Sequence, residues 1–208
     1  MTELVLPLVV RIERDEPPTR TDALEGSARA VLMMLTSERP EWMDAIREWD
    51  AQRIRKVVRR ARGAEWRRAL EVDGLDVAHG SAQLRVYPPI PVDGWPPQLS
   101  RLQVGGTELH DPTAPPHVGS AVPCVLLSPH ASMTAGKAMA QSGHAAQLGW
   151  RSLSRRRREQ WRADGFPLAV RDATPAQWRA ALAAGASVVS DGGFTEVAPG
   201  TQTAAFVG

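Results

Sequence analysis

The sequence predicts an α/β protein made of three layers (α/β/α) around a small mixed sheet, and it predicts this unit twice. Short apolar runs rich in β-branched residues alternate with helical patterns in both halves of the chain. The stretch from Asp111 to Ser120 is rich in Pro and Gly, lacks periodicity and marks a linker. We therefore expect a first domain over residues 1–110, a linker over 111–120 and a second domain over 121–208.

A direct match between the halves supports a tandem duplication. The segment Val57 to Leu70 (VVRRARGAEWRRAL) aligns without a gap with the segment Ala169 to Leu182 (AVRDATPAQWRAAL), and eight of the fourteen positions are identical. Chance similarity between two helices rich in Ala and Arg is the alternative. Because a repeated structural unit leaves self-similarity of this kind, we interpret the match as a duplication.

The first half opens with an apolar run over Leu4 to Ile12, which predicts a strand in which Pro7 needs a bulge or a place in the first turn. Thr19 or Thr21 can cap the next helix, which runs to Leu35. The remaining elements follow from the same periodicities. They are a helix over Glu41 to Gln52, a strand over Arg55 to Ala61, a helix over Ala64 to Val72, strands over Leu75 to Ala78 and Gln83 to Tyr87, and a short helix near Gln98 to Leu102.

The second half repeats this order of elements. We expect strands over Val122 to Leu127, Leu168 to Val170, Ser187 to Val189 and Thr203 to Val207, and helices over Gly136 to Gly149, Ser154 to Ala163 and Pro175 to Ala184.

Composition and charge narrow the class of protein. Lys and Arg number 25 against 23 Asp and Glu, so the net charge does not demand a nucleic-acid partner. Basic residues nevertheless gather in Arg53 to Arg68 and in Arg151 to Arg162; such runs are usually solvated helix faces but can also track phosphates. The single Cys124 precludes an internal disulfide and fits a reducing cytoplasm. We expect neither a membrane span nor a signal peptide.

The stretch from Ser132 to Trp150 carries the most informative polar residues. Ser132 or Thr134 can cap a helix on which Lys137, Gln141, His144 and Leu148 form one stripe. A helix N-terminus with free N–H groups and a lysine can hold an anion or a developing oxyanion. A solvated polar face on a packing helix is the alternative. A nucleotide-binding P-loop is excluded, because Ala131 and Ala138 stand where that motif needs Gly and Ser or Thr.

Two blocks carry a resemblance to a known family. GKAMAQSGHAA, from Gly136 to Ala146, resembles the signature of the archaeal and eukaryotic type of peptidyl-tRNA hydrolase. DGGFTEVAPGTQT, from Asp191 to Thr203, resembles the family's second block. The resemblance covers Val122 to Gly208 and implies that each copy has this family's fold.

The resemblance implies hydrolysis of the ester between a peptide, or an N-blocked amino acid, and tRNA. It assigns Lys137 as the electrophilic residue and Asp191 as a residue that orients water or acts as base, and it leaves open which residue is the base. Gln141 and Thr195 complete the expected catalytic set, and Thr203, Gly136 and His144 are expected to bind substrate. From the basic run we add Arg155 and Arg156, which would bind the phosphates of the tRNA acceptor stem. Asp191 can also belong to a simple turn, and His144 can be structural. Neither a metal cluster nor a cofactor motif is visible, so we expect no cofactor.

Several departures keep a second interpretation open. Ser128, His130 and Ser132 replace the family's charged residues before the helix, and Gly192 replaces Ala. Because Gly208 directly follows the last strand, we expect no closing helix there, and Trp95 to Leu109 resembles that tail. The alternative function is a catalytically weak or inactive module that binds tRNA or protein; a hydrolase of another ester is a third.

The first copy looks like a degenerate scaffold. Where the second has Gly136-Lys137, Gln141 and His144, the first has roughly Thr21-Asp22, Glu25 or Gly26, and Ala28 or Arg29. The family's single-copy enzymes are, by the resemblance, homodimers. A tandem repeat can replace such a two-fold interface, so we expect a monomer in which the first copy is a built-in partner.

Overall fold

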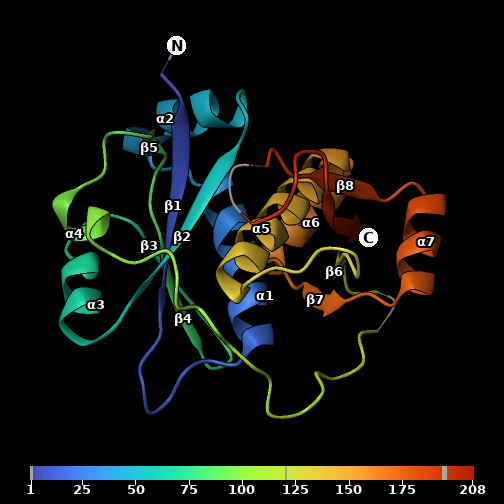
Figure 1. Cartoon of the computed structure of the whole chain (residues 1–208). Coiled ribbons are helices and arrows are strands. Elements are labelled where there is room, and N and C mark those ends of the chain that lie inside the picture. Colours follow the sequence, from blue (N-terminus) through green and yellow to red (C-terminus); the bar gives the residue numbers. More distant parts are fainter. Residues whose placement is uncertain (1, 120, 194–195) are drawn as a thin grey trace.

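The computed structural model describes residues 2–119, 121–193 and 196–208, and within these ranges the chain is a mixed α/β protein with seven helices and two small mixed sheets (Figure 1). The elements of the first half follow one another closely. They are β1 (Leu4–Arg11), α1 (Arg20–Leu35), α2 (Pro40–Asp50), β2 (Arg55–Ala61), α3 (Gly63–Leu70), β3 (Leu75–His79), β4 (Ala82–Val86), β5 (Ile90–Pro91) and α4 (Pro97–Ser100).

The second half has the same succession of elements up to its last strand. It consists of β6 (Cys124–Leu127), α5 (Ala135–Ser152), α6 (Arg155–Ala163), β7 (Ala169–Asp172), α7 (Pro175–Ala183), β8 (Ser187–Ser190) and β9 (Gln202–Val207). The predicted elements are therefore present, with bounds that differ by a few residues, and the two-residue β5 was not predicted.

The two sheets have the same strand order. The first runs β2-β1-β4-β3, with β5 also paired to β1, and the second runs β7-β6-β9-β8. In each, one pair is parallel (β1 with β2, β6 with β7) and the other pairs along the order are antiparallel. Apart from β5, the second sheet thus repeats the strand order and directions of the first.

Two structural details recur at positions that the alignment of the two halves pairs with each other. Trp49 and Trp161 each donate a hydrogen bond from Nε1 to a backbone carbonyl, that of Arg55 and that of Pro167, at 2.9 Å in both cases. Ile54 and Phe166, which precede those carbonyl residues, have positive φ angles of 50° and 59°. A side chain with a Cβ seldom adopts such a φ, so its recurrence at matched positions is what a duplication would produce.

The central helices also align on their N-caps. Thr19 accepts a hydrogen bond from the amide of Asp22, and Thr134 accepts one from that of Lys137. Counted from these caps, three residues of α1 are identical to their counterparts in α5. The pairs are Ala23 with Ala138, Ser27 with Ser142, and Ala30 with Ala145.

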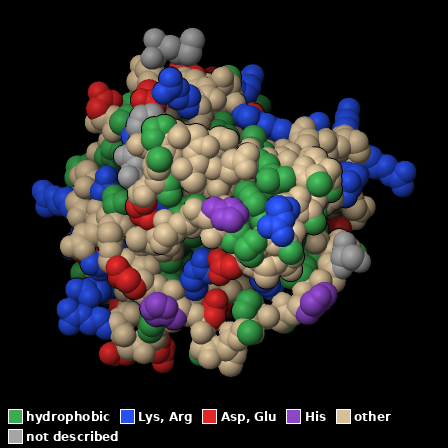
Figure 2. Space-filling model, turned by 45° about the vertical axis from the view of Figure 1, so that its right-hand side comes forward, with side chains coloured by type: hydrophobic (Ala, Val, Ile, Leu, Met, Phe, Trp, Pro, Cys, Tyr) green, Lys and Arg blue, Asp and Glu red, His purple; other side chains and the backbone are tan. Residues whose placement is uncertain are grey.

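These two helices form the middle layer of the molecule. In Figure 1, α1 and α5 lie between the sheets, with α3 and α4 outside the first sheet and α7 outside the second. The helices approach closely, since a Cβ on Gly143 would lie 2.7 Å from Cγ2 of Val31. One continuous apolar core, to which both halves contribute, surrounds this contact. On the face drawn in Figure 2, basic and acidic side chains are interspersed, in keeping with the small net charge.

Pro7 differs from the prediction, because β1 runs through it without a bulge. Its partner on one side is Val57 of β2, and on the other side it lies between the segments that pair with β4 and β5. There its carbonyl accepts the amide of Tyr87 at 3.1 Å, and the reciprocal bond to the carbonyl of Tyr87 is lost because proline has no N–H.

The segment between α4 and β6 connects the halves without regular structure, as predicted for its later part. It nevertheless binds both central helices. Asp111 accepts from the amide and hydroxyl of Thr21, each at 2.8 Å, and Thr107 Oγ1 accepts from the amide of Gly136 at 2.9 Å. None of the helices in the described ranges is long and apolar enough to cross a membrane.

Candidate functional site

A cleft of about 530 Å³ lies between the first turns of α5 and the edge strand β2. Residues of both halves line it. Its polar residues include Lys56, Lys137, Gln141, His144, Asp191 and Glu196, and its apolar ones include Ile54, Val57, Val104, Ala140, Leu148 and Val189. A volume of this size is typical of small-molecule sites.

Four of the predicted site residues meet in one hydrogen-bonded network at the cleft wall. Lys137 Nζ lies 2.6 Å from Asp191 Oδ2, and the same oxygen accepts from Gln141 Nε2 at 2.8 Å. Thr203 Oγ1 donates to Gln141 Oε1 at 2.6 Å, which fixes the orientation of that amide. The network therefore joins the helix that carries the first sequence block to the loop and strand that carry the second.

The side chain of Asp191 is held by three donors. Besides Lys137 and Gln141, the amide of Gly193 donates to Oδ1 at 2.8 Å. The residue is 9% exposed, and so few contacts with water make these donors important. A carboxylate offers about four acceptor positions, and one on Oδ1 has no donor among the residues that the structure describes, so it can accept from a water or a ligand.

The N-terminus of α5 differs from the expectation of free amides. Gly136 donates its amide to Thr107, and Lys137 donates its amide to the capping Thr134. Glu196 in turn accepts from both the amide and the hydroxyl of Thr134. Gly136 is needed for the approach of Thr107, whose Oγ1 would lie 2.9 Å from an added Cβ. Its amide is thus directed to the first half, and not to a ligand.

His144 is partly buried and bonded to a residue of the first half. Its Nδ1 lies 3.2 Å from Lys56 Nζ, which also donates to the carbonyl of Ile54 at 3.1 Å and to Gln147 Oε1 at 2.6 Å. An ammonium has three donors, and these three acceptors match them. On this assignment Nδ1 of His144 accepts, and Nε2 carries the proton.

Burial lowers the pKa of both members of this pair. It lowers the pKa of Lys56 well below its usual value; the charge of Arg151 adds to the effect and that of Asp50 opposes it. Burial, followed by the charges of Lys56 and Lys137, likewise lowers the pKa of His144 well below its usual value. His144 is therefore neutral near pH 7, which is the state that the hydrogen bond from Lys56 requires.

Two other predicted site residues are not brought to the cleft. Arg155 and Arg156 lie on α6, none of whose residues lines the described cleft. The side chain of Arg155 is 91% exposed and pairs with Glu159 at 2.7 Å. Thr195 lies outside the described residues.

Sequence reasoning missed the contribution of β2. Lys56 was interpreted as one member of a basic run, but its neighbours at alternate positions, Ile54 and Val58, are apolar. In a strand, alternate residues face the same side, so this pattern was a signal that Lys56 points inward. Glu196, the partner of the helix cap, carried no local signal.

Comparisons of the chain with models of protein families, with curated proteins and with solved structures found no match. The geometry of the cleft is thus what bears on the chemistry. It combines an ammonium, a buried carboxylate with one open acceptor position, and a neutral imidazole, in a setting suited to binding a polar group next to an apolar one.

Proposed function

We propose that the chain is a peptidyl-tRNA hydrolase, which hydrolyses the ester between a peptide and tRNA in the cleft between β2 and α5. The observation that carries the proposal is the network of Lys137, Asp191, Gln141 and Thr203. The residues that resemble the two blocks of that family come from distant parts of the chain. Lys137, Gln141 and Asp191 line one wall of one cleft, and Thr203 lies buried behind Gln141.

Each group has a part in ester hydrolysis. Water attacks the ester carbonyl, and negative charge develops on the carbonyl oxygen, which the ammonium of Lys137 stabilises. Collapse of the tetrahedral intermediate breaks the ester C–O bond, and the ribose oxygen of tRNA leaves with the proton removed from the water. The open position on Asp191 Oδ1 orients the water or takes its proton. Gln141, fixed by Thr203, keeps Asp191 in place. Losing one preorganised donor of an oxyanion costs about 3 kcal/mol of barrier.

The proposal is tested by release of the N-acetylated amino acid from N-acetyl-aminoacyl-tRNA by the purified full chain. We expect turnover that falls at least about a hundredfold in Asp191→Asn, which keeps the shape but removes the charge. Asp172→Asn is the matched control, because Asp172 is 68% exposed in its side chain and pairs with Arg20, away from the cleft. Equal turnover in the parent and Asp191→Asn, or none in the parent, would reject the proposal.

One observation favours a non-catalytic module as the second candidate. The amides of Gly136 and Lys137 are already bonded within the chain, so the helix N-terminus offers neither of them to an oxyanion. A module of this kind would bind tRNA with an affinity that depends on salt and would release no peptide. The same assay, combined with a tRNA-binding measurement, separates the two.

A further inference from the structure

Along β2, the backbone N–H and C=O groups of every second residue point away from β1. The carbonyl of Ala61 accepts from the amide of Ile12, the residue that follows β1, and so points toward β1. The amide of Arg60 points the opposite way and donates to the carbonyl of Gln103 at 2.8 Å. Residues two apart in a strand direct their N–H and C=O groups to the same side. The N–H groups of Val58 and Lys56 therefore point from the open edge of β2 toward the cleft that both residues line.

The N–H of Val58 has no acceptor among the described residues on that side. Val58 is 4% exposed, and Ala140 lies across the cleft from it. Buried backbone N–H groups are almost always paired. An unpaired one that borders a cleft is a position where a ligand acceptor is stabilised.

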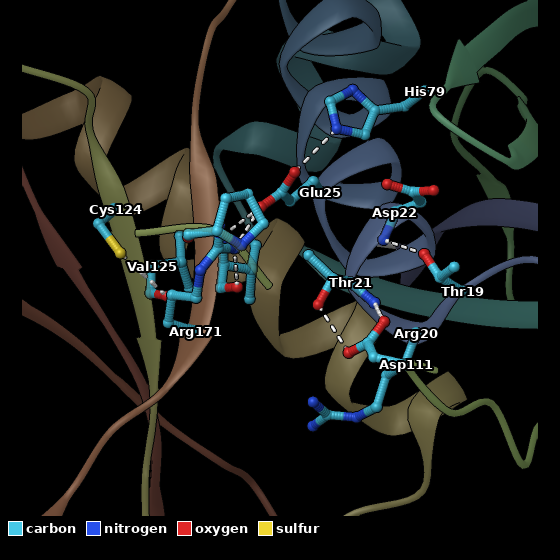
Figure 3. Close-up of polar contacts among 12 residues, drawn as sticks. Thr19, Arg20, Thr21, Asp22, Glu25, His79, Asp111, Cys124, Val125 and Arg171 are labelled. Carbon is cyan, nitrogen blue, oxygen red and sulfur yellow. Dashed lines mark hydrogen bonds and ion pairs between the residues drawn. The ribbon is translucent and has the colours of Figure 1, made fainter. Parts of the chain in front are cut away.

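Each central helix packs against an edge strand of the other half: α1 against β7 (the first junction) and α5 against β2 (the second junction). The first junction shows such an acceptor in place. Val170 of β7 matches Val58, and its N–H donates to Glu25 Oε1 at 3.1 Å. The same oxygen accepts from Arg171 at 2.6 Å, and Oε2 bonds His79 at 2.9 Å (Figure 3). Counted from the caps Thr19 and Thr134, Glu25 of α1 occupies the place that Ala140 has in α5.

The carboxylate of Glu25 thus closes the middle of the first junction. What remains there is an open hollow of about 620 Å³ around Arg29, Met33 and Phe166, which match His144, Leu148 and Ile54. In the second junction, Ala140 leaves the middle empty. The cleft therefore runs along α5 without interruption from Lys137 to Leu148.

The surroundings of Val58 favour a neutral acceptor. Arg171 places its guanidinium beside the Glu25 carboxylate, but its counterpart Arg59 donates to the carbonyls of Ser100 and Leu102 instead. A carboxylate beside Val58 would lack that partner, whereas a peptide carbonyl needs only the N–H. Apolar side chains border the same stretch, and two outward N–H groups at alternate residues suit an extended chain.

We infer that the edge of β2 binds the peptide part of the substrate, with a peptide carbonyl accepting from the N–H of Val58 and the chain extended along the strand. This inference rests on the proposed function, since it places the ester at Lys137 and Asp191 and the peptide toward His144 and Leu148. Addition of a strand to an open sheet edge is a common way of binding peptides, in which main-chain hydrogen bonds supply the affinity.

Backbone amide NMR of the full chain tests the contact without turnover. The probe is the peptide N-acetyl-Ala-Val-Ala-amide, which contains no ester. We expect the Val58 amide proton to shift downfield and to exchange more slowly as the peptide is added, while the Val170 amide, already bonded to Glu25, stays unchanged. No response of Val58 up to the solubility limit of the peptide, or an equal response of Val170, overturns the inference.

The variant Ala140→Glu provides a second test, because it places a carboxylate opposite Val58 as Glu25 does opposite Val170. In this variant we expect slow exchange at Val58 without peptide and no response to peptide. Ala140→Leu is the matched control, because it fills the cleft without an acceptor and should leave Val58 exchange fast.

Steady-state kinetics then test whether the contact at Val58 binds the peptide part of the substrate. The parent should have about fivefold lower KM for N-acetyl-tripeptidyl-tRNA than for N-acetyl-aminoacyl-tRNA, as one hydrogen bond would give, and Ala140→Glu should lose this difference. If the parent hydrolyses neither substrate but Val58 still responds to the peptide, the proposed function fails and the peptide site stands. An unchanged length dependence in Ala140→Glu overturns the inference alone.

Discussion

At the scale of single residues, the structure changes the meaning of Lys137. A charge in the first turn of a helix is usually exposed and contributes little to stability. Here the side chains of Lys137 and Asp191 are only 11% and 7% exposed, and their charged atoms are 2.6 Å apart. The lysine therefore supports the fold as well as the proposed chemistry, because its loss would leave a buried carboxylate with two neutral donors.

The first prediction follows from this pair. We expect Lys137→Ala to lower the free energy of unfolding by about 3 kcal/mol, as for other buried ion pairs that lose one partner, and to lose most hydrolysis. The double variant Lys137→Ala/Asp191→Ala should be less destabilised than the sum of the two single variants. Urea unfolding of the four proteins measures this. Additive effects would show that the pair contributes no coupling energy.

The second prediction concerns the pH dependence that His144 confers. Because the pKa of His144 is lower in the folded protein than its usual 6.5, the unfolded state binds the proton more readily as the pH falls below 6.5. Stability should therefore fall on acidification, by up to about 1.4 kcal/mol per pH unit for this group.

Urea unfolding between pH 5 and pH 7 measures this dependence, in a range above the ordinary pKa values of carboxylates. His144→Asn keeps an acceptor for Lys56 but cannot be protonated, so its stability should depend less on pH. Equal slopes for the parent and the variant would mean that His144 is not held neutral in the folded protein.

At the scale of elements, periodicity and cap chemistry predicted nearly all of the fold. The sequence predicted the strand Arg55–Ala61 and narrowed each helix cap to two residues, of which the structure selects Thr19 and Thr134, because local hydrogen bonding and side-chain alternation determine these features. The bond from Lys56 to His144 and that from Thr107 to Gly136 could not, since they depend on how the halves pack. The second sequence block led to Asp191 and Thr203, but no local pattern indicated an open edge at β2.

The basic helix α6 carries arginines that differ in how they contact their neighbours. Arg155 pairs with Glu159, and the guanidinium of Arg158 lies 5.8 Å from the ring centroid of Trp150. Arg156 and Arg157 have no ion pair among the residues the structure describes. They are therefore the arginines of this helix to test for contacts with tRNA phosphates.

The third prediction is that Arg156→Gln/Arg157→Gln weakens tRNA binding and lowers the log–log salt slope by about 0.7 to 0.9 per phosphate contact removed. Arg67→Gln/Arg68→Gln on α3 is the matched control, since it removes the same charge from an exposed part of the other half. Fluorescence titration of tRNA between 50 and 200 mM salt, as in other systems of this kind, measures the slope. Equal changes in both variants would indicate attraction by net charge alone.

At the scale of the whole molecule, the halves depend on each other. Each central helix contacts an edge strand of the other half: α1 meets β7 through Glu25, and α5 meets β2 through His144 and Gln147. Ser27 of α1 also donates to the carbonyl of Met139 in α5. The cleft exists only where the two halves meet, so the first half supplies part of the site even though it lacks the counterparts of Lys137 and Asp191.

The last prediction tests this dependence. A chain that begins at Val118 keeps Lys137, Gln141, Asp191 and Thr203 but uncovers the face of α5 that packs on α1, which includes Met139 and Gly143. We expect it to self-associate or precipitate, because an exposed apolar face of this kind drives association. The full chain should be a monomer with one cooperative unfolding transition. Light scattering on both proteins decides the matter, and a stable, monomeric and active second half would show that the first half is dispensable.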